Sequence, residues 1–425
     1  MLLSVFALLG STAAGFAGCK KKEPAVATLT ILDMFTMHPE LESYVKDVFQ
    51  PAHPEVTIQW VTPEETDIFG ESPLAQIKDG SLQPDIILLD SGCAYPYIAA
   101  GVLQDIGKNS RLVKLLGNAN LLEGIKKLYQ TPDGNFGIPA YIRYIGHVPN
   151  RPLFEEMGLP VPDKSWTYDD YYDMGQALKP DTYLVYSERE GFSFINPITG
   201  IRYSDGFALH FQDEDYIDYM AKGKKLQEQG VYYRMPPHDH EDEHFFEDEE
   251  RDGGHEHSEE EELAEYMEAT WNPRCLLSLV FEWDFEDAEV LERIKTGVLP
   301  SPLTFGTTIV PSVMMSVGKD APNEKLAVEF MAGFLDETYQ REHARQMMLY
   351  KDISKYTHMA EYGETVGEWM SYTMEKSDSG IILTDFWYWM NEELYPKLES
   401  GEMTLADCAW AMAEEAKKRM EIGVH

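Results

Sequence analysis

The sequence predicts an α/β fold in which helices cover a mainly parallel sheet. The 425 residues are 44% hydrophobic, so the chain is globular and long enough for two or three domains. Three β-branched or aliphatic runs, at 27–35, 56–61 and 84–90, alternate with segments of helical periodicity. This order predicts parallel strands joined by helices, with ligands at the carboxyl ends of the strands.

Two helices are expected between these strands. Leu41, Val45 and Phe49 recur four residues apart within 39–54, which predicts an amphipathic helix. A second helix is expected around 72–81, before the run "PDIILLD". Both helices would cover the sheet formed by the three runs.

The middle of the chain continues with mixed elements. A Gly-Pro turn flanked by aromatic residues predicts strand structure at 134–150. Thr167 and Asp170 have the spacing of a capping box that opens a helix. A further helix is expected at 207–229. An amphipathic helix followed directly by a strand is expected within 264–285.

The C-terminal third returns to a strand followed by helices. The residues at 307–317 predict a strand, and Leu326, Phe330 and Phe334 share one face of a helix at 323–337. The last helix is expected at 403–422. No internal repeat is present in the sequence.

The N-terminus has the features of an export signal. An apolar run at 2–17 is too short to span a bilayer comfortably and contains glycines, so it predicts a signal-peptide core. Cys19 follows two small residues and precedes three lysines, which resembles a bacterial lipobox. We therefore expect a lipoprotein signal peptide at 1–18, lipidation of Cys19 and a polar tether at 19–28, which would anchor the protein without spanning the membrane.

An acidic, histidine-rich run interrupts the pattern at 236–262. The stretch from His238 to Glu262 contains five of the twelve histidines, fourteen carboxylates and one arginine. The histidines are His238, His240, His244, His255 and His257. One interpretation is a solvated inserted loop, because so charged a block cannot bury enough apolar area to fold alone. The other is weak binding of zinc, since imidazoles and carboxylates are zinc ligands.

The net charge of −39 makes the whole surface acidic, which excludes nucleic acid as a partner. Apart from Cys19, the cysteines are Cys93, Cys275 and Cys408. The last two lie in apolar contexts and are expected to be small buried residues. No CxxC, HExxH, GxSxG or Walker motif is present, and no cofactor is expected to be required, so we do not expect an enzyme.

Several stretches in a fixed order resemble those of bacterial extracellular solute-binding protein family 1. They are "PDIILLDSGCAYPYIAAGVLQDI", "DGNFGIPAYIRYIGHVPNRPLFEEMGL", "VPDKSWTYDDYYDMGQAL", "EKLAVEFMAGFLDE" and "LESGEMTLADCAWAMAEE". Pro149-Asn150 stands where the family normally has Tyr-Asn. Members of this family are the sugar-binding lipoproteins of bacterial ABC importers.

The resemblance implies a two-lobed periplasmic-binding-protein-like fold of type II, with a hinge between the lobes. Lobe 1 would comprise 29–140 and about 302–350, and lobe 2 would comprise 141–301 and about 351–425. The histidine-rich run at 236–262 would be an insertion in lobe 2. The protein would be a monomer that captures a carbohydrate, expected to be an oligosaccharide, by hinge closure and delivers it to ABC permease subunits. It would be lipid-anchored on the outer face of the cell membrane, in a Gram-positive bacterium.

A sugar site needs aromatic faces and side chains that bond hydroxyl groups. The candidates at the positions of the family's cleft are Met37, His38, Asp90, Ser91, Tyr141, Arg143, Tyr144, Glu282, Trp283 and Asp284. We expect Trp283 to stack on a sugar, and Asp90, Arg143 and Glu282 to bond hydroxyls.

Purely structural roles are also possible for these residues. Trp283 would equally suit a core, the tyrosines a strand, and the acidic residues a solvated edge. Arg143 fits either an acidic sugar or a cleft carboxylate. The alternative function is a metal-binding surface lipoprotein or metal receptor that uses the histidine-rich run.

Overall fold

The computed structural model describes most of the chain from residue 27 onward. The described residues are 27–34, 39–63, 71–90, 94–122, 125–126, 129–131, 133–162, 167–185, 204–205, 208–233, 272–281, 308–343, 349–352, 355–357, 386 and 389–421. The statements about structure below refer to these residues.

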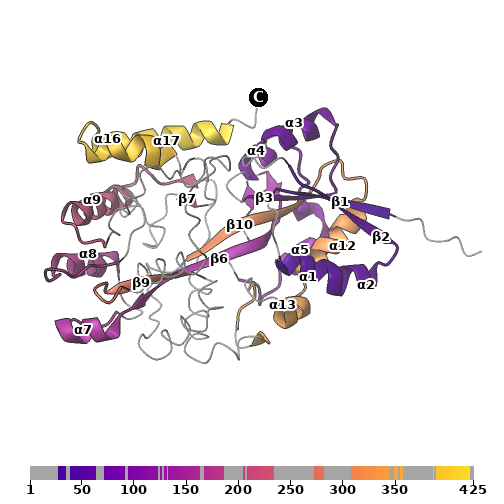
Figure 1. Cartoon of the computed structure of the whole chain (residues 1–425). Helices are drawn as coiled ribbons and strands as arrows, with labels where there is room; N and C mark the ends of the chain where they lie inside the picture. The colour runs from indigo at the N-terminus through magenta and orange to yellow at the C-terminus, as the bar shows by residue number, and fades with distance from the viewer. Residues whose placement is uncertain are drawn as a thin grey trace, which may run out of the picture.

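A mixed sheet runs through the molecule (Figure 1). Its described strands are ordered β2-β1-β3-β10-β6-β9. They are β1 (Ala27–Asp33), β2 (Val56–Val61), β3 (Ile86–Asp90), β6 (Ile138–Pro149), β9 (Leu277–Phe281) and β10 (Thr308–Val317). The first three pair in parallel, as predicted, whereas β10 is antiparallel to both β3 and β6, and β9 is antiparallel to β6. The described sheet is therefore mixed and not mainly parallel, because the later strands return through the sheet in the opposite direction.

Helices surround this sheet. The longer ones are α3 (Glu71–Asp79), α8 (Tyr168–Gln176), α9 (Glu214–Glu228), α12 (Glu324–Phe334) and α17 (Leu405–Glu421). The shorter ones are α1 (Pro39–Tyr44), α2 (Gln50–Ala52), α4 (Ala94–Ala99), α5 (Ser110–Leu116), α7 (Arg151–Met157), α13 (Glu337–His343) and α16 (Tyr395–Glu399). Helical turns of other types lie at Val45–Phe49, Ile106–Lys108 and Met390–Leu394. Two small hairpins pair β4 (Gln130–Thr131) with β5 (Gly134–Asn135), and β7 (Ser204–Asp205) with β8 (Ala208–Leu209).

The buried apolar side chains form three clusters. The first core contains residues of β1, β3, α12 and the 349–356 segment, on one face of the sheet. The third cluster, on the opposite face, contains Leu32, Ile87 and Leu89 together with residues of α4. The second core contains residues of α7, α8, α9 and α17. We call the elements around the first core and the third cluster the first lobe, and those around the second core the second lobe.

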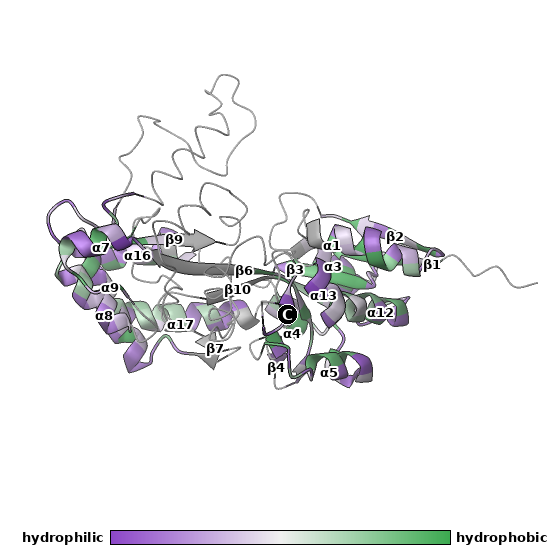
Figure 2. Ribbon diagram, turned by 90° about the horizontal axis from the view of Figure 1, so that it is seen from below, coloured by the Kyte–Doolittle hydropathy of each residue, from purple (hydrophilic) through white to green (hydrophobic). Residues whose placement is uncertain are grey.

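The strands β6 and β10 join the two lobes. Ile138 and Ile142 of β6 belong to the first core, and the last five residues of this strand pair with β9 in the second lobe. Strand β6 is long because its first half lies in the first lobe and its second half pairs with β9 in the second lobe. Figure 2 shows helices with hydrophobic residues on their inner sides and hydrophilic residues on their outer sides, as burial on one face requires.

Most predicted elements are confirmed, with one boundary changed. The capping box forms: the Thr167 side chain accepts from Asp170 N, and the Asp170 carboxylate accepts from Thr167 N. Phe330 and Phe334 of α12 are fully buried, and Leu326 packs against the first core. The helix expected at 207–229 starts only at Glu214, because Ala208–Leu209 pairs with Ser204–Asp205 as a hairpin. The periodic pattern alone did not reveal this short strand.

Candidate ligand-binding site

The carboxyl ends of β1 and β3 lie at one edge of the sheet, next to the junction of the lobes. The two strands are parallel neighbours, and Asp33 at the end of β1 is paired with Leu88 of β3. The last residue of β3 is Asp90. Ligands in α/β proteins bind outside the carboxyl ends of parallel strands, so this edge is the candidate site.

Asp90 and Tyr141 lie in one row across three strands. Val313 of β10 is the register partner of Asp90 on β3 and also of Tyr141 on β6. The pairing of β10 with β6 is irregular on both sides of Val313, between Pro311 and Met314. Two of the residues predicted from sequence are thus brought to the same level of the sheet although they are 51 positions apart in the chain.

Strand alternation places the polar residues of this edge on one face of the sheet. Leu32 and Leu89, which immediately precede Asp33 and Asp90, belong to the third cluster. The two aspartates therefore lie on the opposite face, which is that of the first core. Tyr141 also packs against the first core, at the point where the pairing of β6 with β10 is irregular. Each of the three side chains interacts with neighbouring residues.

The sequence interpretation missed Asp33. Its side chain is only 8% exposed, so a carboxylate is buried at the end of an otherwise apolar strand. A buried carboxylate is costly unless it is paired, and such residues often serve a site. The sequence did contain a feature that points to Asp33. The run "TILD" ends the first strand with an aspartate, as "ILLD" ends the third strand with Asp90.

Arg143 and Tyr144 lie on β6 where this strand passes between the lobes. Their backbones pair with Val310 and Ile309 of β10. They are therefore two and three residues further along the strand than Tyr141, toward the second lobe. Their backbones thus lie where β6 passes from the first lobe to the second, and their role in binding stays a prediction.

The other predicted site residues lie outside the described part of the chain. They are Met37, His38, Ser91, Glu282, Trp283 and Asp284. The lipidation site Cys19 and the five histidines His238, His240, His244, His255 and His257 also lie outside it. The triplet at 282–284 follows directly on β9, whose last residue, Phe281, pairs with Ile145 of β6.

Asp85 fixes the opposite ends of the strands that carry the aspartates. Its carboxylate is buried, with 1% exposure, and accepts hydrogen bonds from Thr30 N at 2.9 Å and Asn323 N at 2.6 Å. The Asn323 side chain donates to the same carboxylate at 3.2 Å and to Thr28 O at 2.8 Å. These bonds tie β1, β3 and the start of α12 together, so the two strand ends hold a fixed relative position.

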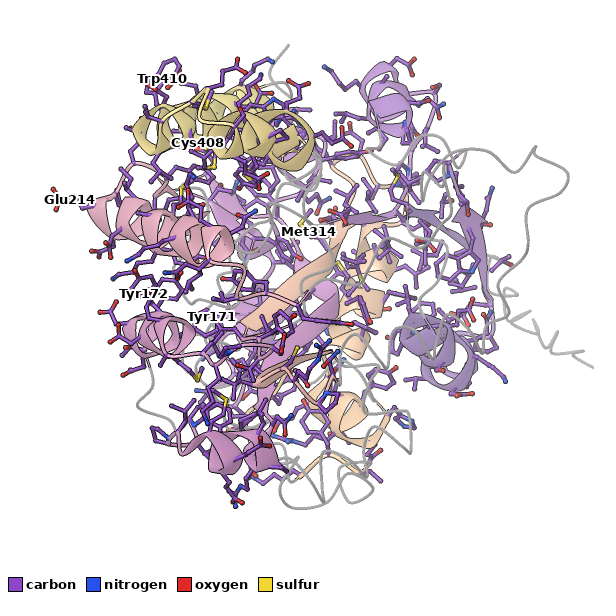
Figure 3. The ribbon with its side chains drawn as sticks, turned by 60° about the vertical axis from the view of Figure 1, so that its left-hand side comes forward. Tyr171, Tyr172, Glu214, Met314, Cys408 and Trp410 are labelled. Carbon is purple, nitrogen blue, oxygen red and sulfur yellow. The ribbon has the colours of Figure 1, made fainter. Side chains whose placement is uncertain are left out.

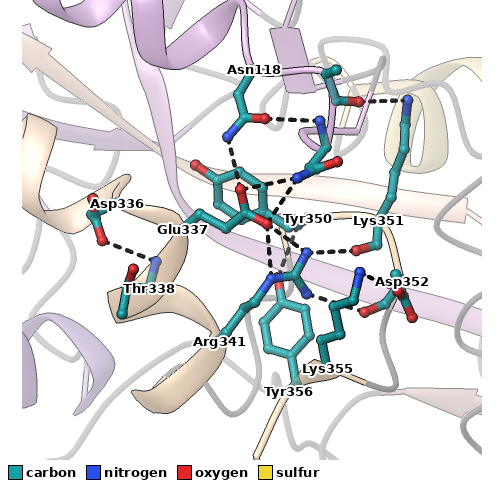
Figure 4. Close-up of polar contacts among 12 residues, drawn as sticks. Asn118, Asp336, Glu337, Thr338, Arg341, Tyr350, Lys351, Asp352, Lys355 and Tyr356 are labelled. Atoms are coloured by element: carbon teal, nitrogen blue, oxygen red, sulfur yellow. Dashed lines mark hydrogen bonds and ion pairs between the residues drawn. The ribbon is translucent and has the colours of Figure 1, made fainter.

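A second polar cluster holds residues 349–352 and 355–357 against the first lobe (Figure 4). The Glu337 carboxylate accepts from Arg341 Nη2 at 2.8 Å and from the Asn118 and Asn120 side chains at 2.9 and 3.2 Å. Arg341 also donates to the carbonyl oxygens of Lys351 and Asp352. The Arg341 guanidinium lies between the rings of two tyrosines, Tyr350 and Tyr356, at 5.8 and 5.3 Å.

The hydrogen bonds in this cluster set the ionisation of Glu337. Burial alone would raise its pKa, but the bonds from Asn118, Arg341 and Asn120 outweigh burial and lower the pKa below the ordinary value. The carboxylate is therefore charged at neutral pH, as its pairing with Arg341 requires. Tyr356 packs in the first core, whereas Phe386 packs in the second core. The chain therefore passes from the first lobe to the second between these two residues.

A separate pocket of about 310 Å³ lies at the amino end of β3, away from the aspartates. It is lined by apolar residues of α3 and its following loop, and by Lys78, Lys319 and Asp320. Lys78, Lys319 and Asp320 are exposed, and the pocket opens on the outer side of the first lobe. It is therefore distinct from the candidate site.

The described cysteines offer no nucleophile. Cys275 and Cys408 are unpaired and fully buried, as predicted, and burial raises the pKa of each thiol to about 12. Figure 3 shows Cys408 on the inner side of α17 and Trp410 on its outer side. A buried thiol of high pKa is not ionised at neutral pH, so neither residue attacks a substrate.

Within the described ranges, no group of three or more His, Cys, Asp or Glu side chains is arranged to hold a metal ion. The helices of these ranges are also all too short or too polar to cross a membrane.

The comparisons with known proteins agree with this geometry. Residues 36–341 match the family of bacterial extracellular solute-binding proteins. Comparison with curated protein sequences found no match. The chain belongs to the bacterial extracellular solute-binding protein family, and the predicted family is confirmed.

Solved structures share the fold at low sequence identity. The sugar-binding protein MalE of Xanthomonas citri has a TM-score of 0.66 and 13% identity, over 93% of this chain and 97% of that one. An ABC substrate-binding protein of Listeria monocytogenes in complex with cycloalternan has a TM-score of 0.58 and 13% identity, over 93% and 99%. The cyclic α-maltosyl-1,6-maltose binding protein of Arthrobacter globiformis has a TM-score of 0.58 and 14% identity, over 93% and 99%. The predicted two-lobed α/β fold is confirmed.

Proposed function

We propose that this protein is the substrate-binding receptor of an ABC importer and that it captures a saccharide between its two lobes. The observation that carries the proposal is the row formed by Asp90 and Tyr141 at the carboxyl edge of the first-lobe sheet, where β6 and β10 cross to the second lobe. Membership of a solute-binding family supports a role in capture, without bond making or breaking.

The chemistry of the edge suits a hydroxyl-rich ligand. The Asp33 and Asp90 carboxylates accept hydrogen bonds, and the Tyr141 ring offers an apolar face with a polar tip. Sugars present both features, hydroxyl groups and apolar ring faces. The three similar solved structures described above are of a sugar-binding protein, a cyclic α-maltosyl-1,6-maltose binding protein and a complex with cycloalternan, which supports the same ligand class here.

Capture would proceed by closure of the lobes about β6 and β10. Ligand contacts from both lobes would favour the closed form, and that form would be recognised by permease subunits. The residues following β9, Glu282, Trp283 and Asp284, would supply the second-lobe contacts, and Trp283 would stack on the sugar. We further propose a monomer with lobe boundaries as expected above, anchored outside the cell through lipidated Cys19.

The first experiment is a thermal-shift panel on the chain from Lys20 onward, which contains every described residue. The panel includes glucose, maltose, maltotriose, cyclic glucose oligosaccharides, uronic acids, amino acids, peptides and Zn²⁺, each with and without EDTA. A ligand that binds only the native state stabilises it by about 3 kcal/mol when its concentration is one hundred times its Kd. This stabilisation raises the melting temperature. The expected result is a large shift with one saccharide that is insensitive to EDTA.

A shift with amino acids or peptides alone would overturn the saccharide class but keep the receptor. A shift with Zn²⁺ alone, abolished by deleting residues 238–262, would overturn the proposal in favour of metal capture. The described residues hold nothing that favours metal capture, and zinc binding by the histidine-rich run stays a prediction.

A further inference from the structure

The strand β2 forms one edge of the main sheet and pairs with β1 alone among the described strands. It lies on the outer side of the first lobe (Figure 1). An edge strand presents a row of backbone N–H and C=O groups that can pair with another chain. Whether this edge is open depends on which of these groups are already bonded.

The register of β1 with β2 identifies the residues whose backbone faces outward. Ala27 N donates to Glu55 O at 3.3 Å, so the odd-numbered residues of β2 turn their backbone groups toward β1. The backbone N–H and C=O groups of Val56, Ile58 and Trp60 therefore point away from β1.

Within the described structure, only the first of these three residues has partners for its outward groups. Val56 N donates to His53 O at 3.0 Å, and Val56 O accepts from Gln50 Nε2 at 2.7 Å. No described residue bonds the outward groups of Ile58 and Trp60. Edge strands of soluble proteins are usually protected by a charge, a proline or a bulge, and the six residues of β2 include none of these. The second half of β2 is therefore an open edge.

The side chains of β2 suit a neighbouring strand of the same sequence. Ile58 packs on the first core, and Trp60 lies on the same face of the strand but is 39% exposed. When two copies of β2 pair antiparallel about Gln59, Ile58 of each copy lies opposite Trp60 of the other. All the outward backbone groups of these residues then have partners. Opposed aromatic and β-branched side chains on one face also stabilise a sheet.

The charge of the chain favours a second copy at this strand. The net charge is −39, so two copies repel each other wherever their carboxylates meet. The strand β2 carries no charged side chain, and Gln59 would face Gln59 of the other copy on the two-fold axis. Two copies can therefore pair along β2 without placing like charges opposite each other within the paired segment.

We propose that the open half of β2 pairs with β2 of a second copy, in antiparallel orientation about Gln59, so that the two first-lobe sheets become continuous. The contact is much smaller than the about 1,000 Å² of a stable interface, so the pairing is weak and needs a high local concentration. In dilute solution the chain stays a monomer, as proposed above. The contact uses the side of β2 that faces away from β1, so the inference does not depend on saccharide capture.

The first test places charges at the two-fold axis. Gln59 is exposed, and strand alternation directs its side chain away from the first core. Gln59→Lys is expected to weaken self-association about threefold, because two like charges then lie opposite each other. Gln59→Glu is expected to weaken it as well, whereas an equimolar mixture of the two variants should associate at least as tightly as the unsubstituted chain. Sedimentation equilibrium over a wide range of concentrations measures the affinities, on the chain from Lys20 with Cys93→Ser to prevent a disulfide between copies.

Repulsion between whole molecules predicts a different order. In so acidic a chain each added lysine lowers the repulsion between copies, so Gln59→Lys would associate most tightly, the mixture next and Gln59→Glu least. That order, equal affinities of all the variants, or no self-association of the unsubstituted chain overturns the proposal. Gln212→Lys, at an exposed position of the second lobe, is the control and is expected not to weaken self-association.

A second measurement captures a weak pair covalently. Opposite residues that share no backbone bonds in an antiparallel pair have Cα atoms about 4.5 Å apart, which is within the range of a disulfide. Gln59→Cys is therefore expected to form a disulfide-linked dimer rapidly when diamide takes up the two electrons and two protons of the paired thiols. Gln212→Cys is the control and is expected to cross-link only at the slower rate of random encounters. Equal rates for the two variants overturn the proposal.

Discussion

Asp90 and Tyr141 lie opposite the same residue, Val313, on the two sides of β10. One carboxylate and one aromatic ring are thereby held at a fixed level of the sheet where the two lobes meet. This arrangement leads to a direct test of the site. Contacts in the first lobe lead to two further tests, and the buried thiols lead to a third.

Asp90→Asn is expected to weaken binding of the saccharide found in the panel by about tenfold or more, since a hydrogen bond to a charged group contributes about 1.5–3 kcal/mol. Isothermal titration measures the affinity. Asp320→Asn, an exposed residue at the other end of the sheet, is the control and is expected to bind normally. Equal affinity of the two variants would remove Asp90 from the site.

Gly333→Ala is expected to destabilise the protein by about 1–3 kcal/mol, although alanine normally favours a helix. A Cβ atom at Gly333 would lie 2.2 Å from the Tyr44 hydroxyl oxygen, which donates to Phe330 O at 2.9 Å. Urea unfolding measures the change.

The Tyr44→Phe background provides the control for Gly333→Ala, because it removes the oxygen that the new methyl group meets. The cost of Gly333→Ala should be smaller there than in the unsubstituted chain. An equal cost in both backgrounds would show that close packing against Tyr44 is not the cause.

Stability is expected to fall on acidification partly through Glu337. Its pKa is lowered in the folded protein, so its contribution is complete above the unfolded-state pKa and is lost as the pH falls through the folded-state pKa. Urea unfolding at pH 6 and near pH 3.5 should show a smaller difference for Glu337→Gln than for the unsubstituted chain. Glu342→Gln, whose side chain is 61% exposed, should leave the difference unchanged.

Cys275 and Cys408 are expected not to react with a thiol reagent in the native protein, because both are fully buried with a pKa of about 12. The measurement is absorbance with Ellman's reagent at pH 8 on the chain from Lys20 with Cys93→Ser. Two thiols should appear after addition of guanidinium chloride. Rapid reaction of either thiol without denaturant would contradict the buried packing.

Much of the first lobe could be predicted because local patterns and tertiary contacts agree there. The apolar runs that become β1, β2 and β3 are buried or half-buried strands, and the face of α12 that carries Phe330 and Phe334 is the buried one. The hairpin at 204–209 was missed because a two-residue strand leaves no periodic signal.

The site was predicted only in part for a physical reason. Asp90 was chosen because it follows a strand and Tyr141 because it lies at the first crossover, and the register of the sheet places both opposite Val313. Asp33 was missed because nothing local distinguishes a buried carboxylate from an exposed one. Its 8% exposure results from neighbours that are distant along the chain.

The sequence by itself determined the family, the order of the elements and the burial of Cys275 and Cys408. Each of these depends on residues close together along the chain. Only the tertiary structure decided that β6 and β10 serve both lobes and that Asp90 and Tyr141 lie level with each other on the two sides of Val313. It also decided that α17 ends against α4. These relations depend on strand register and on packing between distant segments, which local propensity does not encode.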